Sequence, residues 1–127
     1  MRVNFISVVA CCLLAGGTAH ADETFNSIDL DHDGRIDEQE AQAAGRAVFQ
    51  RLDANRDGNL DVPEINGRLG PAVLKAADPG ADRALNGEEY ATLITARFKA
   101  ANTDADGKVD QDELKTLTGA LLLLMIK

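Results

Sequence analysis

One pattern of acidic residues and glycine occurs four times in this chain, in twelve-residue windows that begin about 24 residues apart. The windows span residues 29–40, 53–64, 78–89 and 102–113. Repetition at a nearly fixed interval indicates an array of similar units rather than one chance match. All of the 21 acidic residues except Asp22 and Glu23 fall inside these windows. The negative charge of the chain is therefore concentrated at four repeated points.

The places within each window have separate physical tasks. Side-chain oxygens at the first, third and fifth places, a backbone carbonyl at the seventh, a side chain or water at the ninth and a bidentate glutamate at the twelfth form an oxygen shell suited to Ca²⁺. The sharp turn at the sixth place favours glycine, which adopts positive φ without strain. Glycine fills it in three windows, as Gly34, Gly58 and Gly107. The eighth place, which can form a β contact with a neighbouring loop, is apolar in all four: Ile36, Leu60, Leu85 and Val109.

With these windows the chain resembles the EF-hand superfamily, whose members bind calcium in a loop between two helices. The first two windows, DLDHDGRIDEQE and DANRDGNLDVPE, match D-x-[DN]-x-[DN]-G with a twelfth-place glutamate in full. The resemblance, closest in kind to small bacterial secreted or periplasmic proteins with four calmodulin-like loops, implies an all-α fold. We expect a compact array of four helix–loop–helix motifs with short β contacts between loops.

The resemblance also implies the metal ligands, with the seventh residue of each loop acting through its backbone carbonyl. They are Asp29, Asp31, Asp33, Arg35, Asp37 and Glu40 in loop one; Asp53, Asn55, Asp57, Asn59, Asp61 and Glu64 in loop two; and Asn102, Asp104, Asp106, Lys108, Asp110 and Glu113 in loop four. The expected cofactor is Ca²⁺, in two or three copies. Mg²⁺ is disfavoured because it requires a tight octahedron and keeps several waters.

Two windows depart from the pattern. Asn102 begins loop four with an amide oxygen, which can coordinate calcium but brings no charge, so we expect weaker binding there. Loop three, DPGADRALNGEE, has Gly80 without a side-chain ligand at the third place, Pro79 at the second, and Arg83 where the turn favours glycine. We expect loop three to bind weakly or to stay empty while keeping a role in loop pairing.

The first 21 residues form a separate segment. Arg2 is followed by an apolar run over residues 3–15, and Ala19-His20-Ala21 has the small-x-small form of a signal-peptidase site. We expect residues 1–21 to be removed as a signal peptide, which leaves residues 22–127 as one EF-hand domain in the periplasm or outside the cell.

Two alternatives for this segment stay open. It could be a membrane anchor, although its apolar run is shorter than the ~20 residues that a bilayer requires. It could also be a lipoprotein signal that places a lipid on Cys11, since Val8-Val9-Ala10-Cys11 loosely resembles such a motif. Cleavage after Ala21 would remove both cysteines, Cys11 and Cys12, and leave a mature chain without disulfides or a transmembrane anchor.

Between the windows, apolar residues recur at helical spacing. The two stripes are Ala41, Ala44, Val48, Phe49 and Leu52, and Tyr90, Leu93, Ile94, Phe98 and Ala101. A helix of about 15 residues in each link would hold its two flanking loops ~20 Å apart. We therefore expect that loop one does not touch loop two, and that loop three does not touch loop four.

The middle link contains Gly70-Pro71. Proline lacks a backbone donor and pushes the residue before it out of helical geometry, so one helix should end near Leu69 and another should begin at Pro71. Such a hairpin would bring loops two and three together and leave loops one and four to meet at the other end. A break at Gly45 is the alternative, and it would let successive loops pair.

The first and last helices of the mature chain differ in predicted stability. A short first helix from about Asp22 to Ile28 should turn Phe25 and Ile28 inward, but it is marginal alone. Leu114 and Leu117 lead into a last helix that is apolar all round from Ala120 to Ile126. Such a helix usually completes a core. Alternatively it forms an exposed patch for a protein partner, for self-association or for a membrane surface.

Several functions are disfavoured. The formal net charge of −8 would repel nucleic acid. We expect no enzymatic activity, because no nucleophile, base and orienting group can be assembled and His32 occupies the fourth, outward-facing place of loop one. Two classes remain: a calcium buffer or calcium-stabilised module, and a calcium sensor that exposes an apolar surface to a protein partner. Sensor grooves are often rich in methionine, and the mature chain has only Met125, which favours the first class.

Overall fold

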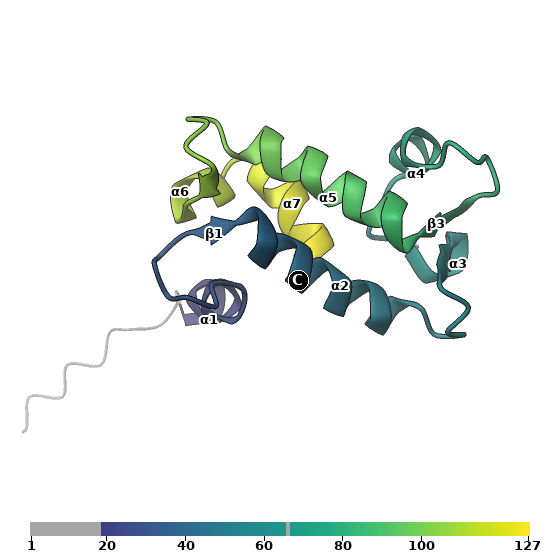
Figure 1. Ribbon diagram of the computed structural model, residues 1–127, viewed down its shortest axis with the longest axis horizontal. Coiled ribbons are helices and arrows are strands. Elements are labelled where there is room, and N and C mark those ends of the chain that lie inside the picture. Colours follow the sequence, from purple (N-terminus) through teal and green to yellow (C-terminus); the bar gives the residue numbers. More distant parts are fainter. Residues whose placement is uncertain (1–18, 66) are drawn as a thin grey trace, which may run out of the picture.

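The computed structural model describes residues 19–65 and 67–127. Its helices are α1 (Ala19–Ile28), α2 (Glu38–Leu52), α3 (Val62–Ile65), α4 (Pro71–Ala77), α5 (Gly87–Ala101), α6 (Gln111–Leu114) and α7 (Leu117–Ile126). Its short strands are β1 (Ile36–Asp37), β2 (Asn59–Asp61), β3 (Ala84–Asn86) and β4 (Lys108–Val109). Figure 1 shows α2 and α5 running along the length of the molecule. The expected all-α array of helix–loop–helix units with short β contacts is confirmed.

The long helices α2 and α5 begin at reciprocal caps. The Asp37 carboxylate accepts the N–H of Glu40 at 2.8 Å, and Glu40 in turn accepts the N–H of Asp37 at 2.9 Å. Asn86 and Glu89 make the same exchange at the start of α5. Each cap satisfies amide groups that a helix N-terminus leaves without intrahelical partners. The ninth and twelfth places of a loop therefore start the helix that follows it.

The predicted apolar stripes of α2 and α5 face the core, and α2 continues without a break through Gly45. A Cβ atom at Gly45 would lie 2.0 Å from Ile94 Cδ1, so the glycine lets the two helices approach closely. Gln42 Nε2 also donates across this contact to Ala91 O at 2.8 Å and to Thr95 Oγ1 at 2.9 Å. The alternative of a helix break at Gly45 is wrong.

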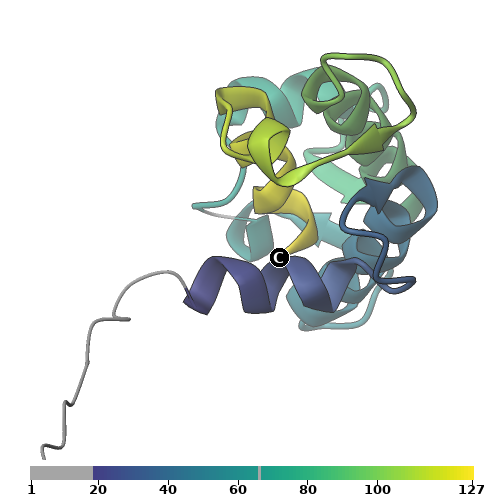
Figure 2. The ribbon, with the colours of Figure 1, turned by 90° about the vertical axis from the view of Figure 1, so that its left-hand side faces the viewer.

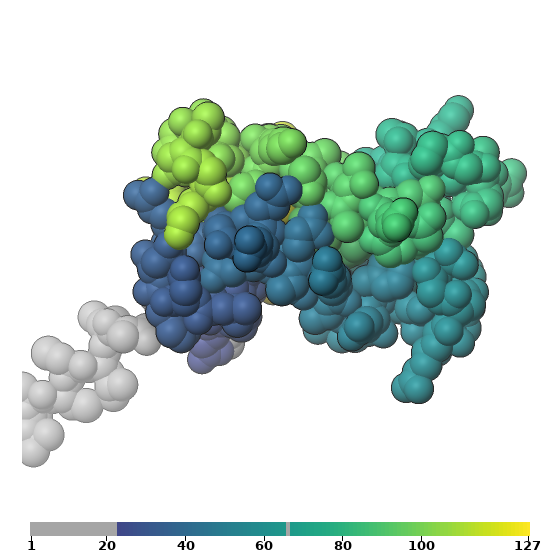
Figure 3. Space-filling model, in the orientation of Figure 1, coloured from purple at the N-terminus to yellow at the C-terminus, as the bar shows by residue number. Residues whose placement is uncertain are grey.

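The loops pair at the two ends of the long helices. Strand β1 is antiparallel to β4, with Ile36 opposite Val109, and β2 is antiparallel to β3, with Leu60 opposite Leu85. All four side chains are 0% exposed. Figure 3 shows segments distant in sequence meeting at each end, dark blue with light green at one and two shades of teal at the other. The predicted pairing of loop one with loop four, and of loop two with loop three, is confirmed.

The middle link differs in part from the prediction. Helix α4 begins at Pro71 as expected, but α3 ends at Ile65 rather than near Leu69. Gly67 adopts a φ of 88°, a left-handed conformation that commonly terminates a helix. The N–H groups of Arg68 and Leu69 then turn back to Ile65 O at 3.0 and 3.4 Å. The left-handed conformation of Gly67 therefore ends helix α3 upstream of Pro71.

Helix α7 packs against both α2 and α5 and completes the core (Figure 2). Leu122, Met125 and Ile126 are buried, and the Tyr90 hydroxyl donates to Met125 O at 2.8 Å. Burial raises the pKa of Tyr90 to about 12. Leu124 remains 45% exposed and Leu117, at the start of the helix, 78% exposed. None of the helices within residues 19–65 and 67–127 is long and apolar enough to cross a membrane.

Helix α1 packs beside α2, and its Phe25 and Ile28 side chains are buried, as the sequence predicts. Residues 1–18 of the predicted signal segment, together with Cys11 and Cys12, lie outside the described residues. The last three residues of that segment, Ala19–Ala21, are helical and open α1. Cleavage after Ala21 would leave α1 with residues 22–28, the extent that the sequence predicts for the first helix.

The contact between α6 and α7 depends on Gly119. A Cβ atom there would lie 2.2 Å from Glu113 O and 2.4 Å from Leu114 Cα, and backbone atoms cannot move aside as a flexible side chain can. We expect Gly119→Ala to lower the free energy of unfolding by about 1–3 kcal/mol, measured by urea denaturation in excess calcium. Gly70→Ala is the control, because an added Cβ would meet no atom within 4 Å. Equal effects of the two substitutions would contradict the close packing.

Candidate metal centre

Backbone amides of loop one (residues 29–40) donate to the carboxylates of the same loop. Asp29 Oδ2 accepts the N–H of Gly34 at 2.9 Å, and Asp29 Oδ1 accepts the N–H of Asp33 at 3.2 Å. Asp31 Oδ1 also accepts the N–H of Asp33, at 3.1 Å. Asp29 is 2% exposed although it carries an acidic side chain. These bonds fold the loop around its own acidic groups.

The twelfth-place Glu40 joins the two ends of loop one. Its Oε1 accepts the N–H groups of Leu30 and Asp31 at 2.7 and 3.2 Å, while Oε2 accepts the N–H of Asp37 at 2.9 Å. Asp29, Asp31 and Glu40 each offer one oxygen, and these oxygens lie within 4.8 Å of one another. Oxygens bound to one Ca²⁺ at ~2.3–2.6 Å can lie at most about 5.2 Å apart. The three side chains therefore fit a shared calcium ion.

Loop two (residues 53–64) and loop four (residues 102–113) repeat this framework in part. Asp53 accepts the N–H groups of Asp57 and Gly58 at 3.2 and 3.0 Å, and Glu64 Oε1 accepts the N–H of Ala54 at 3.0 Å. Glu113 Oε1 accepts the N–H of Thr103 at 2.8 Å. The other predicted ligand residues lie along the loops, exposed or half-buried: Asp33, Arg35, Asp37, Asn55, Asp57, Asn59, Asp61, Asn102, Asp104, Asp106, Lys108 and Asp110.

Loop three (residues 78–89) keeps the same backbone turn without the sixth-place glycine. Arg83 has a φ of 65°, close to the left-handed values of Gly34 and Gly58 at 83° and 84°. Its N–H donates to Asp78 Oδ2 at 2.8 Å. The glycine amides of loops one and two likewise donate to the first-place aspartate of their own loop. A left-handed conformation costs a residue with a Cβ atom about 1–2 kcal/mol relative to glycine. The turn is therefore preserved at the expense of local strain.

Two first-place oxygens lack hydrogen-bond partners. Asp78 Oδ1 in loop three and Asn102 Oδ1 in loop four are buried, and no partner for either lies among the described residues. The equivalent Asp29 and Asp53 use both carboxylate oxygens as acceptors. A buried acceptor without a partner carries a desolvation cost of about 1–3 kcal/mol. A cation in these loops would satisfy both oxygens, so the donor set of the array fits a hard, oxygen-binding metal.

Two ion pairs that the sequence pattern does not predict connect loops one and four. The Arg35 guanidinium pairs with the Asp106 carboxylate, and the Lys108 ammonium pairs with the Asp33 carboxylate. The hydrogen bond from Lys108 holds the pKa of Asp33 below its ordinary value, and the same bond raises the pKa of Lys108. The signal in the sequence is a basic residue at the seventh place of both loops, where calcium coordination requires only the backbone carbonyl.

Comparison with known protein families agrees with the geometry of these loops. The sequence pattern of the EF hand family matches residues 21–42, 46–67 and 94–118. These segments contain loops one, two and four in full and together cover more than half of the chain. A search among curated proteins gave no match. The loops therefore indicate calcium binding, and the chain belongs to the EF-hand family.

Proposed function

We propose that this protein binds two or three calcium ions through loops one, two and four, and that these ions hold its helices together. It would act as a calcium buffer or as a calcium-stabilised module in the periplasm or outside the cell. The observation that carries the proposal is the convergence of Asp29, Asp31 and Glu40, whose oxygens lie within 4.8 Å of one another. The signal-like segment at residues 1–21 supports the location.

The four loops should differ in affinity because they differ in ligand charge. Loop one has five carboxylates among its ligand places, and loop two has four together with Asn55. Loop four begins with the neutral Asn102. Loop three lacks a third-place ligand at Gly80, and Pro79 has no N–H to donate to Glu89. We rank loop one as the tightest site and loop three as the weakest.

Calcium titration calorimetry should give two or three bound ions per chain, with calcium bound more tightly than magnesium in competition. The double variant Glu40→Gln and Glu64→Gln should lose the two tightest ions, because each substitution removes a charged oxygen from a closing ligand. Unchanged stoichiometry in this variant, no binding at millimolar calcium, or equal affinity for the two metals would each overturn the assignment.

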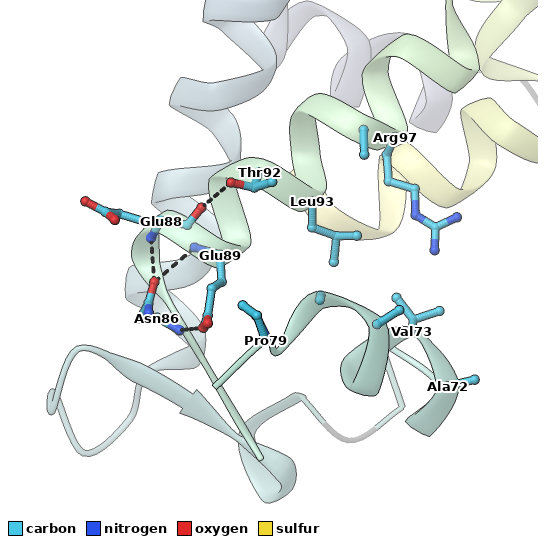
Figure 4. A pocket seen from close by; sticks show the side chains of 12 residues that line it. Ala72, Val73, Pro79, Asn86, Glu88, Glu89, Thr92, Leu93 and Arg97 are labelled. Carbon is cyan, nitrogen blue, oxygen red and sulfur yellow. Dashed lines mark hydrogen bonds between the residues drawn. The ribbon is translucent and has the colours of Figure 1, made fainter. Parts of the chain in front are cut away.

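A sensor function is the second candidate, and one feature favours it. A groove of about 740 Å³ lies between α4 and α5 beside loop three (Figure 4). Its apolar lining comes from α4, from Pro79 and from α5, including Val73 and Leu93. A fluorescent probe of apolar surface would distinguish the functions. A sensor should bind the probe more strongly with calcium than with chelator, whereas a buffer or calcium-stabilised module should not.

A further inference from the structure

The two loop pairs have the same register but carry different side chains at the seventh place. In each pair the two eighth-place residues face each other, and the seventh-place residues Asn59, Ala84 and Lys108 lie opposite ninth-place residues. In loops two and three the seventh place holds the neutral residues Asn59 and Ala84. In loops one and four it holds Arg35 and Lys108. Of the two loop pairs, only that of loops one and four places a cation beside a predicted calcium ligand of the opposite loop.

The contacts of these cations are reciprocal. Arg35 of loop one pairs with Asp106, the fifth-place ligand of loop four, and Lys108 of loop four pairs with Asp33, the fifth-place ligand of loop one. Each fifth-place carboxylate uses its other oxygen to accept a backbone N–H within its own loop, from Arg35 at 2.8 Å and from Lys108 at 2.9 Å. Both oxygens of Asp33 and of Asp106 therefore have partners.

We propose that Arg35 and Lys108 are counter-ions that each loop supplies to its partner, so that the side chain at the seventh place of one loop sets the calcium affinity of the other. An ion in loop one would share the Asp33 carboxylate with the Lys108 ammonium, which already neutralises part of its charge and repels a second cation. The same competition applies between Arg35 and an ion in loop four. This inference rests on the proposed binding of calcium by loops one and four.

The size of the effect follows from the exposure of the ion pairs. From 33% to 50% of each participating side chain is exposed. Exposed ion pairs are weak, so their removal should tighten calcium binding only about 1.4- to fivefold. The effect should be smaller in about 1 M salt than in about 0.01 M salt, because the screening length falls from ~30 Å to ~3 Å.

The test is a calcium titration of the ¹⁵N-labelled chain followed by NMR, with the amides of Gly34 and Gly107 reporting separately on loops one and four. Lys108→Met should tighten loop one more than loop four, although the substitution lies in loop four. Arg35→Met should do the reverse. Both substitutions keep the seventh-place backbone carbonyl. With chelator, both variants should melt at a lower temperature than the wild-type protein, because a ligand carboxylate has lost its counter-ion.

Three further variants separate this crossed effect from a change in net charge. Lys99→Met removes one exposed cation near loop four and should affect neither loop selectively. Lys108→Arg keeps the charge and should retain the wild-type affinity. Ala84→Lys introduces a seventh-place cation into loop three, and the shared register predicts weaker binding in loop two through Asp57.

The outcomes are distinct from those that test calcium binding itself. A wild-type chain that bound no calcium would overturn the proposed function. A wild-type chain that bound calcium normally, with Lys108→Met acting mainly on loop four or acting as Lys99→Met does, would overturn only the crossed counter-ions. Crossed changes in both loops, with little change in Lys108→Arg, would establish them.

Discussion

Calcium in excess should raise the melting temperature of this protein by about 20 °C or more relative to chelator. An ion that binds only the folded chain adds about 2.7 kcal/mol per site at 100 times its dissociation constant, so two sites add about 5 kcal/mol. A domain of this size gains about 4–8 °C in melting temperature for each kcal/mol. The measurement is circular dichroism melting in excess calcium and in excess chelator.

The buried acidic groups explain why the effect should be large. Asp29, Glu40, Asp53, Asp78 and Glu113 are each 9% exposed or less, and they include the first-place aspartates of three loops. Like charges held in such environments repel one another and lose solvation unless a cation compensates them. Without calcium, the chain should therefore be loosely packed or partly unfolded. Its helix content should also be lower.

A pair of neighbouring residues in loop four provides the control. Glu113→Gln alters a buried side chain that is the predicted twelfth-place ligand, whereas Asp112→Asn alters a side chain that is 89% exposed and paired with Lys115. Glu113→Gln should reduce the calcium-dependent rise in melting temperature, and Asp112→Asn should leave it nearly unchanged. If the wild-type protein had the same melting temperature and helix content with chelator as with calcium, the ions would not be structural.

The pairing of the loops could be predicted because it depends on local geometry. Uninterrupted helical stripes separate loop one from loop two and loop three from loop four, while Gly70-Pro71 folds the middle link back. The end of α3 could not be placed as well. Gly67 and Gly70-Pro71 are both signals for a helix end, and they lie within five residues of each other. The left-handed conformation of Gly67, visible only in the structure, shows that the helix ends at the earlier signal.

The sequence predicts the ligand places within each loop, but it does not predict the ion pairs between loops. The spacing of acidic residues identifies each loop because every place has its own chemical task. The ion pairs from Arg35 and Lys108 depend instead on which loops pair and on the register between them. The unpartnered oxygens of Asp78 and Asn102 likewise depend on the burial of particular atoms. Such features emerge only once the chain is folded in three dimensions.

The second large effect should come from α7. Leu122 is 0% exposed in the core between α2 and α5, whereas Leu124, two residues later on the same helix, is 45% exposed. Leu122→Ala should lower the free energy of unfolding by about 2–5 kcal/mol, because it removes buried apolar area and leaves a cavity. Leu124→Ala should change it by less than about 0.5 kcal/mol, as expected for a substitution at the surface. Urea denaturation in saturating calcium measures both.

A destabilised Leu124→Ala protein, accompanied by a change in sedimentation from an oligomer to a monomer, would instead identify this face of α7 as a site of self-association. Equal and small effects of both substitutions would contradict the role of α7 in the core.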